Sequence, residues 1–128
     1  MADIRIENVP ALGEPLGPYS HLARVRGARE TVYIAGMVCE GATFEAQCEG
    51  VYEAIAKALA AVGASWPHVV QFTTYLVHSQ DIARFMAWRR ERYTRLFPDG
   101  RYPPNTLLVV DRLVREDYLI EVQTIAAL

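Results

Sequence analysis

The 128-residue chain is poor in cysteine, and Cys39 and Cys48 are its only thiols. Two thiols cannot complete a structural zinc site, and the spacing of this pair matches no metal or redox motif. Cys48 falls on the apolar face of a predicted helix, so we expect a buried core thiol there. The histidines His21, His68 and His78 also lack metal-ligand spacing. We therefore expect neither a metal nor another cofactor.

The chain also lacks a strong excess of charge and a long apolar run. Its formal net charge is −2 and its pI is about 5.9, so it has no basic field to attract a nucleic-acid backbone. No segment approaches the ~20 apolar residues that span a bilayer. The N-terminal MADIRIENVP contains no apolar signal segment. We expect a cytoplasmic protein without nucleic-acid or membrane partners.

There is no internal repeat, low-complexity tract or linker, and 52% of the residues are hydrophobic, which indicates one domain over residues 1–128. Alternating apolar and polar residues predict strands at 4–9, 20–26 and 31–38, and the last two are expected to form a hairpin. β-branched and aromatic residues predict a central strand at 69–77. The final strands are predicted at 106–113 and 118–128, also as a hairpin.

Two helices interrupt this series of strands. Apolar residues recur every three or four positions over 44–62 and predict a helix with Thr43 as its N-cap. A second helix is predicted over 81–97, before the turn Pro-Asp-Gly. Arg89 is an anomaly in this helix, because it falls in the middle of the apolar face.

The element order βββαβαββ indicates an α+β fold, a six-stranded mixed sheet with two helices on one face. Both faces of the strand at 69–77 carry apolar or aromatic residues, but two helices can cover only one face. A homo-oligomer that buries the open face is therefore expected, with ligand sites in the clefts between subunits.

Four stretches, taken together, resemble the reactive intermediate deaminase family (Rid or YjgF, also labelled L-PSP endoribonuclease). They are LGEPLGPYSHLARV at 12–25, VYIAGMV at 32–38, the segment 45–77, and PPNTLLVVDRLVREDYLIEVQTIAA at 103–127. The resemblance implies a chorismate-mutase-like fold assembled as a homotrimer. It also implies hydrolysis of enamines and imines derived from amino acids to a 2-keto acid and ammonia, without metal or cofactor.

Matched by position, the resemblance makes Glu121 the glutamate that positions or activates water. It makes Tyr19 the tyrosine that closes the pocket. The glycine of the family's Ser-Gly-Gln motif matches Gly36, whereas Ala35 and Met37 replace the serine and the glutamine of that motif.

The family arginine that clamps the substrate carboxylate is Asn105 in this chain. Asparagine donates amide hydrogen bonds but lacks the charge of a guanidinium. The lost charge is worth roughly 1.5–3 kcal/mol, or about one to two decades of affinity for a carboxylate. Arg89 and Arg90 are the candidates for a relocated cation. Alternatively, Arg89 packs its stem at the core edge and pairs its head with a carboxylate.

Two functions of different class fit these residues. One is an enzyme that hydrolyses an imine or enamine, in which Glu121 handles water, Asn105 and Gly36 orient the substrate, and the substrate differs because Asn105 replaces arginine. The other is a trimer that binds a small metabolite, such as a keto acid, without turnover. Glu121 could instead form an interfacial salt bridge with Arg112, and Tyr19 could pack only for its area. Ribonuclease activity is disfavoured by the acidic charge and by the lack of a histidine pair.

Overall fold

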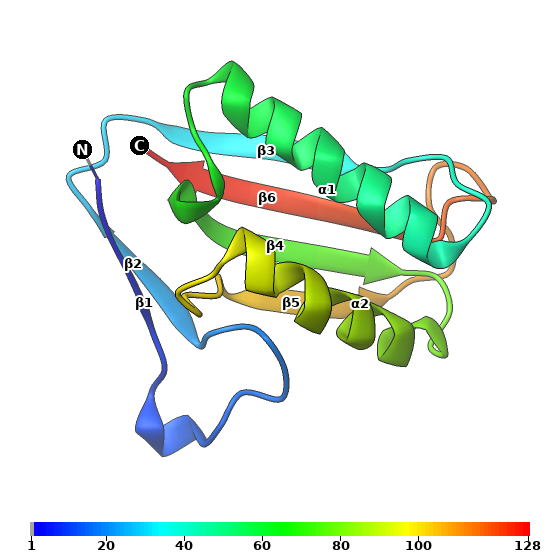
Figure 1. Cartoon of the computed structure of the whole chain (residues 1–128), viewed down its shortest axis with the longest axis horizontal. Coiled ribbons are helices and arrows are strands. Elements are labelled where there is room, and N and C mark those ends of the chain that lie inside the picture. Colours follow the sequence, from blue (N-terminus) through cyan, green and yellow to red (C-terminus); the bar gives the residue numbers. More distant parts are fainter. Residues whose placement is uncertain (1) are drawn as a thin grey trace.

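The computed structural model describes residues 2–128, in which two helices cover one face of a sheet (Figure 1). The strands are β1 (Asp3–Glu7), β2 (Leu22–Arg26), β3 (Thr31–Met37), β4 (Val69–Leu76), β5 (Asn105–Val109) and β6 (Ile120–Ala127). The helices are α1 (Phe44–Ala61) and α2 (Asp81–Leu96), and short 3-10 turns lie at Pro10–Leu12 and Trp66–His68. The predicted order βββαβαββ is confirmed, as is the placement of both helices on one face.

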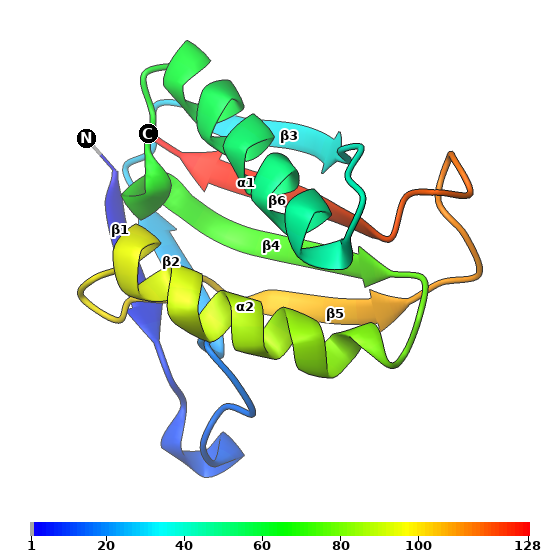
Figure 2. The ribbon, with the colours of Figure 1, turned by 45° about the vertical axis from the view of Figure 1, so that its right-hand side comes forward.

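Local capping explains where α1 begins and ends. The Thr43 hydroxyl accepts the Ala46 N–H at 3.1 Å, so the predicted N-cap is confirmed. Such a cap is worth about 1 kcal/mol. After Ala61, Gly63 adopts a φ of 75°, which reverses the chain at little steric cost. The apolar face of α1 packs on β3 and β6, and α2 lies beside it over β4 and β5 (Figure 2).

The core between the helices and the sheet is rich in aromatic rings. The centroids of Tyr52 and Trp88 are 4.8 Å apart, and those of Tyr93 and Phe97 are 4.9 Å apart. The hydroxyls of Tyr52 and Tyr93 share a hydrogen bond of 2.7 Å, which satisfies both groups inside this cluster. Cys48 is fully buried, as predicted, and this burial raises the pKa of its thiol.

The six strands do not pair as the sequence predicts. β2 pairs with β1 rather than with β3, and this two-stranded ribbon is not hydrogen-bonded to the four-stranded sheet of order β3-β6-β4-β5, although β2 contacts β4. β5 and β6 do not form a hairpin either, because β4 lies between them. The connection from β4 through α2 returns β5 parallel to β4, and β5 takes the outer edge of β4 because β6 pairs with its other edge. Alternation indicated strands correctly but carried no information about their partners.

The register of β4 determines which side chains face the helices. Phe72, Thr74 and Leu76 are fully buried and alternate with Thr73 and Tyr75, which are partly exposed. Because successive strand residues point to opposite faces, the first three lie under the helices and the other two on the open face. No helix within residues 2–128 is long and apolar enough to cross a membrane.

Candidate functional site

Asn105 is held at the first position of the edge strand β5. The Pro104 carbonyl accepts the Phe72 N–H at 2.9 Å, so the segment before Asn105 is already joined to β4. Asn105 lies opposite Phe72 and therefore on the helix-covered face. The buried Thr74 hydroxyl donates to Asn105 Oδ1 at 2.7 Å. The amide nitrogen, which has no hydrogen-bond partner within residues 2–128, is left as a donor.

Arg89, on α2, is only 2% exposed and is the bulkiest of the fully buried side chains. Its Nη2 lies 3.1 Å from Met86 Sδ, whereas its Nε and Nη1 are buried without a hydrogen-bond partner. Its guanidinium carbon lies 5.0 Å from the ring centroid of Phe85 and 5.8 Å from that of Tyr93. Arg89 thus packs its stem in the core, as one of the two sequence-based alternatives predicts. Within the described chain, however, its guanidinium lacks the carboxylate partner that this alternative also predicts.

Arg89 and Asn105 meet at one cavity of about 310 Å³ between α2, β5 and the N-terminal loop. Tyr19 lines the same cavity, and its hydroxyl oxygen accepts the Leu16 N–H at 3.2 Å. The remaining walls are apolar and consist of Leu16, Ile82, Met86 and Leu107. The cavity therefore combines a buried cation and two neutral polar groups with a hydrophobic lining.

The loop that carries Tyr19 approaches α2 closely at Gly17. A Cβ at this position would lie 2.2 Å from Met86 Cε and 3.2 Å from Arg89 Nη2. A side chain at this position would require the flexible end of Met86 to move and Arg89 Nη2 to shift by a few tenths of an ångström. The loop thus keeps Arg89 covered and brings Tyr19 to the cavity wall.

Glu121 and Gly36 lie together on the opposite face of the sheet. Glu121 pairs with Tyr75 on β4 and therefore points to the open face. A Cβ on Gly36 would lie 2.2 Å from Glu121 Oε2 and 2.9 Å from its Cγ, so the missing side chain makes room for the glutamate. Arg112, the proposed alternative partner of Glu121, instead donates to Glu116 at 3.2 Å within the chain.

The six sequence-predicted site residues are thus distributed over three places. Tyr19, Arg89 and Asn105 share one cavity, whereas Gly36 and Glu121 lie on the other face of the sheet. Arg90 is exposed on α2 and does not line the cavity. A single chain cannot bring both groups to one small ligand.

Sequence reasoning missed Thr74, which orients the Asn105 amide, and the apolar wall formed by Met86 and Leu107. Thr74 did leave a signal, because it is a polar residue between the apolar Phe72 and Leu76 on the same face of one strand. The two wall residues left no signal, since apolar residues at such positions are typical of any core.

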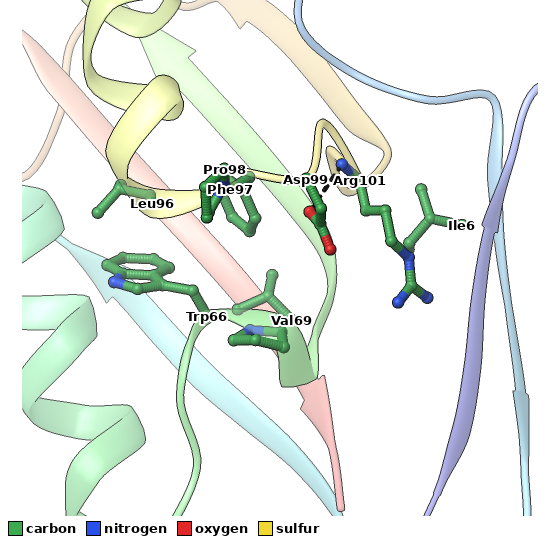
Figure 3. A pocket seen from close by; sticks show the side chains of 9 residues that line it. Ile6, Trp66, Val69, Leu96, Phe97, Pro98, Asp99 and Arg101 are labelled. Atoms are coloured by element: carbon green, nitrogen blue, oxygen red, sulfur yellow. Dashed lines mark hydrogen bonds between the residues drawn. The ribbon is translucent and has the colours of Figure 1, made fainter.

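A second cavity, of about 150 Å³, lies between β1, the turn at Trp66–His68 and the end of α2 (Figure 3). Its lining is mostly apolar. Of its two charged side chains, Arg101 donates to the Ile4 carbonyl at 2.6 Å, and Asp99 accepts the Arg101 backbone N–H at 3.1 Å. This cavity contains none of the sequence-predicted site residues, so we regard it as a packing feature of the ribbon.

The tyrosine pair behind Arg89 predicts a loss of stability at alkaline pH. Burial raises the pKa of Tyr93 to about 12, an effect that the nearby Arg89 charge partly offsets, and burial raises the pKa of Tyr52 well above its usual value. Both phenols are harder to ionise in the folded protein than in the unfolded chain. Their contribution to the free energy of unfolding is therefore complete below pH 10 and is lost as the pH rises toward 12. For Tyr93 alone the loss is about 2–3 kcal/mol.

Urea unfolding at a series of pH values from neutral to strongly alkaline measures this effect. The free energy of unfolding should fall above pH 10, and it should fall less steeply in Tyr93→Phe. The buried Cys48 thiol adds a loss of the same sign, so wild type and variant must be compared with Cys48 intact. Parallel curves for the two proteins would show that Tyr93 does not contribute.

Within residues 2–128, no three His, Cys, Asp or Glu side chains are grouped so that they could hold a metal ion. Arg89 is the cation of the candidate site, Tyr19 and Asn105 are its neutral polar groups, and Glu121 is the carboxylate on the opposite face.

Comparison with known proteins places this chain in a family. Residues 10–128 match the family described as Endoribonuclease L-PSP. No curated protein matches the chain. A Yersinia pestis protein of unknown function from the Rid family, YyfB, is 27% identical, with a TM-score of 0.81 and 98% of each chain covered.

Two further solved structures agree with this assignment. NMB1025 of Neisseria meningitidis, a member of the YjgF family, is 26% identical, with a TM-score of 0.68, covering 98% of this chain and 94% of that one. A putative endoribonuclease from Thermotoga maritima is 27% identical, with a TM-score of 0.65 and 88% of each chain covered. The family match spans nearly the whole chain and the fold is shared, so the protein belongs to the Rid/YjgF family, also described as Endoribonuclease L-PSP.

Proposed function

We propose that this protein is a small-molecule enzyme that hydrolyses a C=N bond, in an imine or in the imine tautomer of an enamine. The observation that carries the proposal is a cavity of small-molecule size lined by the buried cation Arg89 and by two neutral polar side chains, Asn105 and Tyr19. Such a group of donors suits the carboxylate of an amino-acid-derived imine. The walls of the cavity suit an apolar side chain.

Hydrolysis at this site needs only water and proton transfer. The Glu121 carboxylate takes a proton from water as the water oxygen bonds to the imine carbon, and it passes this proton to the imine nitrogen, which gives a carbinolamine. Glu121 then takes the hydroxyl proton of the carbinolamine and gives it to the amino group, which leaves as ammonia while the carbon–oxygen bond becomes a carbonyl. One imine and one water thus give one carbonyl compound and one ammonia, and nothing is oxidised or reduced.

Glu121 can act on a ligand in the Arg89 cavity only if the two belong to different copies of the chain. We therefore propose a homotrimer in which each cleft combines the cavity of one copy with Glu121 and Gly36 of the next. The open face that carries Glu121 also exposes apolar side chains, with Tyr33 74% and Leu108 44% accessible. Contact between copies would cover these side chains.

The proposal is tested by following the decay of freshly generated 2-aminoacrylate and 2-iminopropionate with and without the wild-type protein. We expect faster decay, with equal amounts of ammonia and 2-oxo acid as products. A parallel incubation with RNA tests the activity in the family description, and we expect the RNA to stay intact. Unchanged decay of both compounds would contradict the proposal.

One observation favours a second function, binding without turnover. Ala35, Met37 and Asn105 replace a serine, a glutamine and an arginine of the family motifs, so the site has lost three polar or charged groups. A trimer of this kind would bind a 2-oxo acid and yet leave imine decay unchanged. The decay assay combined with calorimetric binding of the 2-oxo acid separates the two functions.

A further inference from the structure

We propose that Arg89 is the group that binds the ligand's carboxylate, so that a cation on helix α2 takes the place of the arginine missing from strand β5. The preferred ligand would then be a small monocarboxylate with an apolar side chain. The choice of 2-imino and 2-oxo acids as the chemical class rests on the proposed function. The inference that Arg89 binds an organic anion does not rest on the proposed function.

The first argument for this inference is that the polar residues of the cavity have hydrogen-bond donors without partners. Arg89 lines the cavity, and its Nε and Nη1, which have almost no exposed surface, have no hydrogen-bond partner within residues 2–128. The Asn105 amide oxygen accepts the Thr74 hydroxyl, and within the same residues its N–H groups have no partner. The Tyr19 oxygen already accepts from Leu16, so its O–H remains to donate. A site with only donors to offer suits a ligand that has only acceptors, such as a carboxylate.

The second argument is the balance of charge around Arg89. A guanidinium keeps its charge in a protein, and burying it without an anion is costly. Three carboxylates of the two helices pair with other arginines: Asp81 and Glu45 pair with Arg84, and Glu49 pairs with Arg92. Arg89 therefore presents one uncompensated positive charge, which matches a ligand with a single negative charge.

The surroundings of Arg89 hold its guanidinium in place before any ligand arrives. Its guanidinium carbon lies close to the rings of Phe85 and Tyr93, at 5.0 and 5.8 Å from their centroids. Gly17 also brings the loop backbone close to its Nη2. A group fixed in this way loses little conformational freedom on binding, which favours affinity. The cavity volume, about 310 Å³, matches the size of a small ligand.

Calorimetric titration with 4-methyl-2-oxopentanoate and with its neutral amide tests the inference. We expect the wild type to bind the acid more tightly than the amide. Arg89→Met should lower the affinity for the acid by about 10- to 100-fold and leave the affinity for the amide unchanged. The affinity of Arg89→Lys for the acid should fall between those of the wild type and Arg89→Met, since lysine keeps the charge but not the paired hydrogen-bond geometry of arginine. The matched control Arg90→Met, at the exposed neighbouring position, should bind like the wild type.

A double variant moves the cation back to the strand. Arg89→Met combined with Asn105→Arg should recover part of the affinity for the acid, because both positions line the same cavity. Equal binding of acid and amide by the wild type, or wild-type affinity in Arg89→Met, would overturn the inference. So would an Arg89→Met protein whose only defect is a smaller assembly in sedimentation, because Arg89 would then pair with a carboxylate of a second copy. If Arg89→Met still hydrolyses the imine, only the inference about Arg89 is overturned. If binding of the acid depends on Arg89 but no hydrolysis is observed, only the proposed function is overturned.

Discussion

Replacing Glu121 by glutamine is expected to slow imine hydrolysis by about 10²- to 10⁴-fold, the range for loss of a general base. Glutamine keeps the shape of the side chain, so it should still fit beside Gly36, where a Cβ would come within 2.2 Å of Oε2. It cannot take a proton from water, however. The measurement is the rate of ammonia release from 2-iminopropionate at saturating substrate.

Two controls separate this effect from damage to the fold. The free energy of unfolding of Glu121→Gln and its affinity for a 2-oxo acid should stay close to those of the wild type. Glu91→Gln, an exposed glutamate side chain on α2 with 79% accessibility, should keep full activity. A wild-type turnover rate in Glu121→Gln would show that Glu121 is not the base, and its place beside Gly36 would then need a structural explanation.

Replacing Arg89 by methionine is expected to stabilise the ligand-free protein by about 1–4 kcal/mol, the range seen when buried ion pairs are replaced by apolar groups of similar volume. Arg89 is 2% exposed, has two nitrogens without partners and contacts mainly Met86, Phe85 and Tyr93. Methionine fills most of the same space without a charge to desolvate. The protein would thus gain stability while it loses its anion site, as is typical of functional residues.

Urea unfolding without ligand measures this gain. Arg95→Met is the control, because Arg95 is an exposed arginine of the same helix, and its replacement should change the free energy of unfolding by less than about 0.5 kcal/mol. If Arg89→Met were instead less stable than the wild type, Arg89 would be making a favourable contact in the folded protein, and the view of it as an uncompensated charge would be wrong.

The sequence was sufficient to predict the elements but not their neighbours. The change of period at Thr43 located α1 and its cap, because helices and strands repeat apolar residues at different intervals. The same alternation could not tell that β2 pairs with β1, since it reports which side of a strand is buried and not which strand lies beside it. Both predicted hairpins failed for this reason.

The candidate site was predictable only one residue at a time. Arg89 stood out because a charge on an apolar stripe breaks the helical pattern, and burial of that residue is now observed. Its meeting with Asn105 depends on the parallel pairing of β4 and β5 below α2, a long-range contact that leaves no local trace. The separation of Asn105 from Glu121 likewise follows from register, which the sequence does not state.

The opposite orientations of Asn105 and Glu121 also have a consequence for how the protein works in dilute solution. If two copies must meet to complete each cleft, the number of working sites follows the association equilibrium and not the number of folded chains. Diluting the protein below the dissociation constant of the assembly would remove its turnover while every chain kept its secondary structure. The rate per chain would then depend on how much of the protein the cell makes.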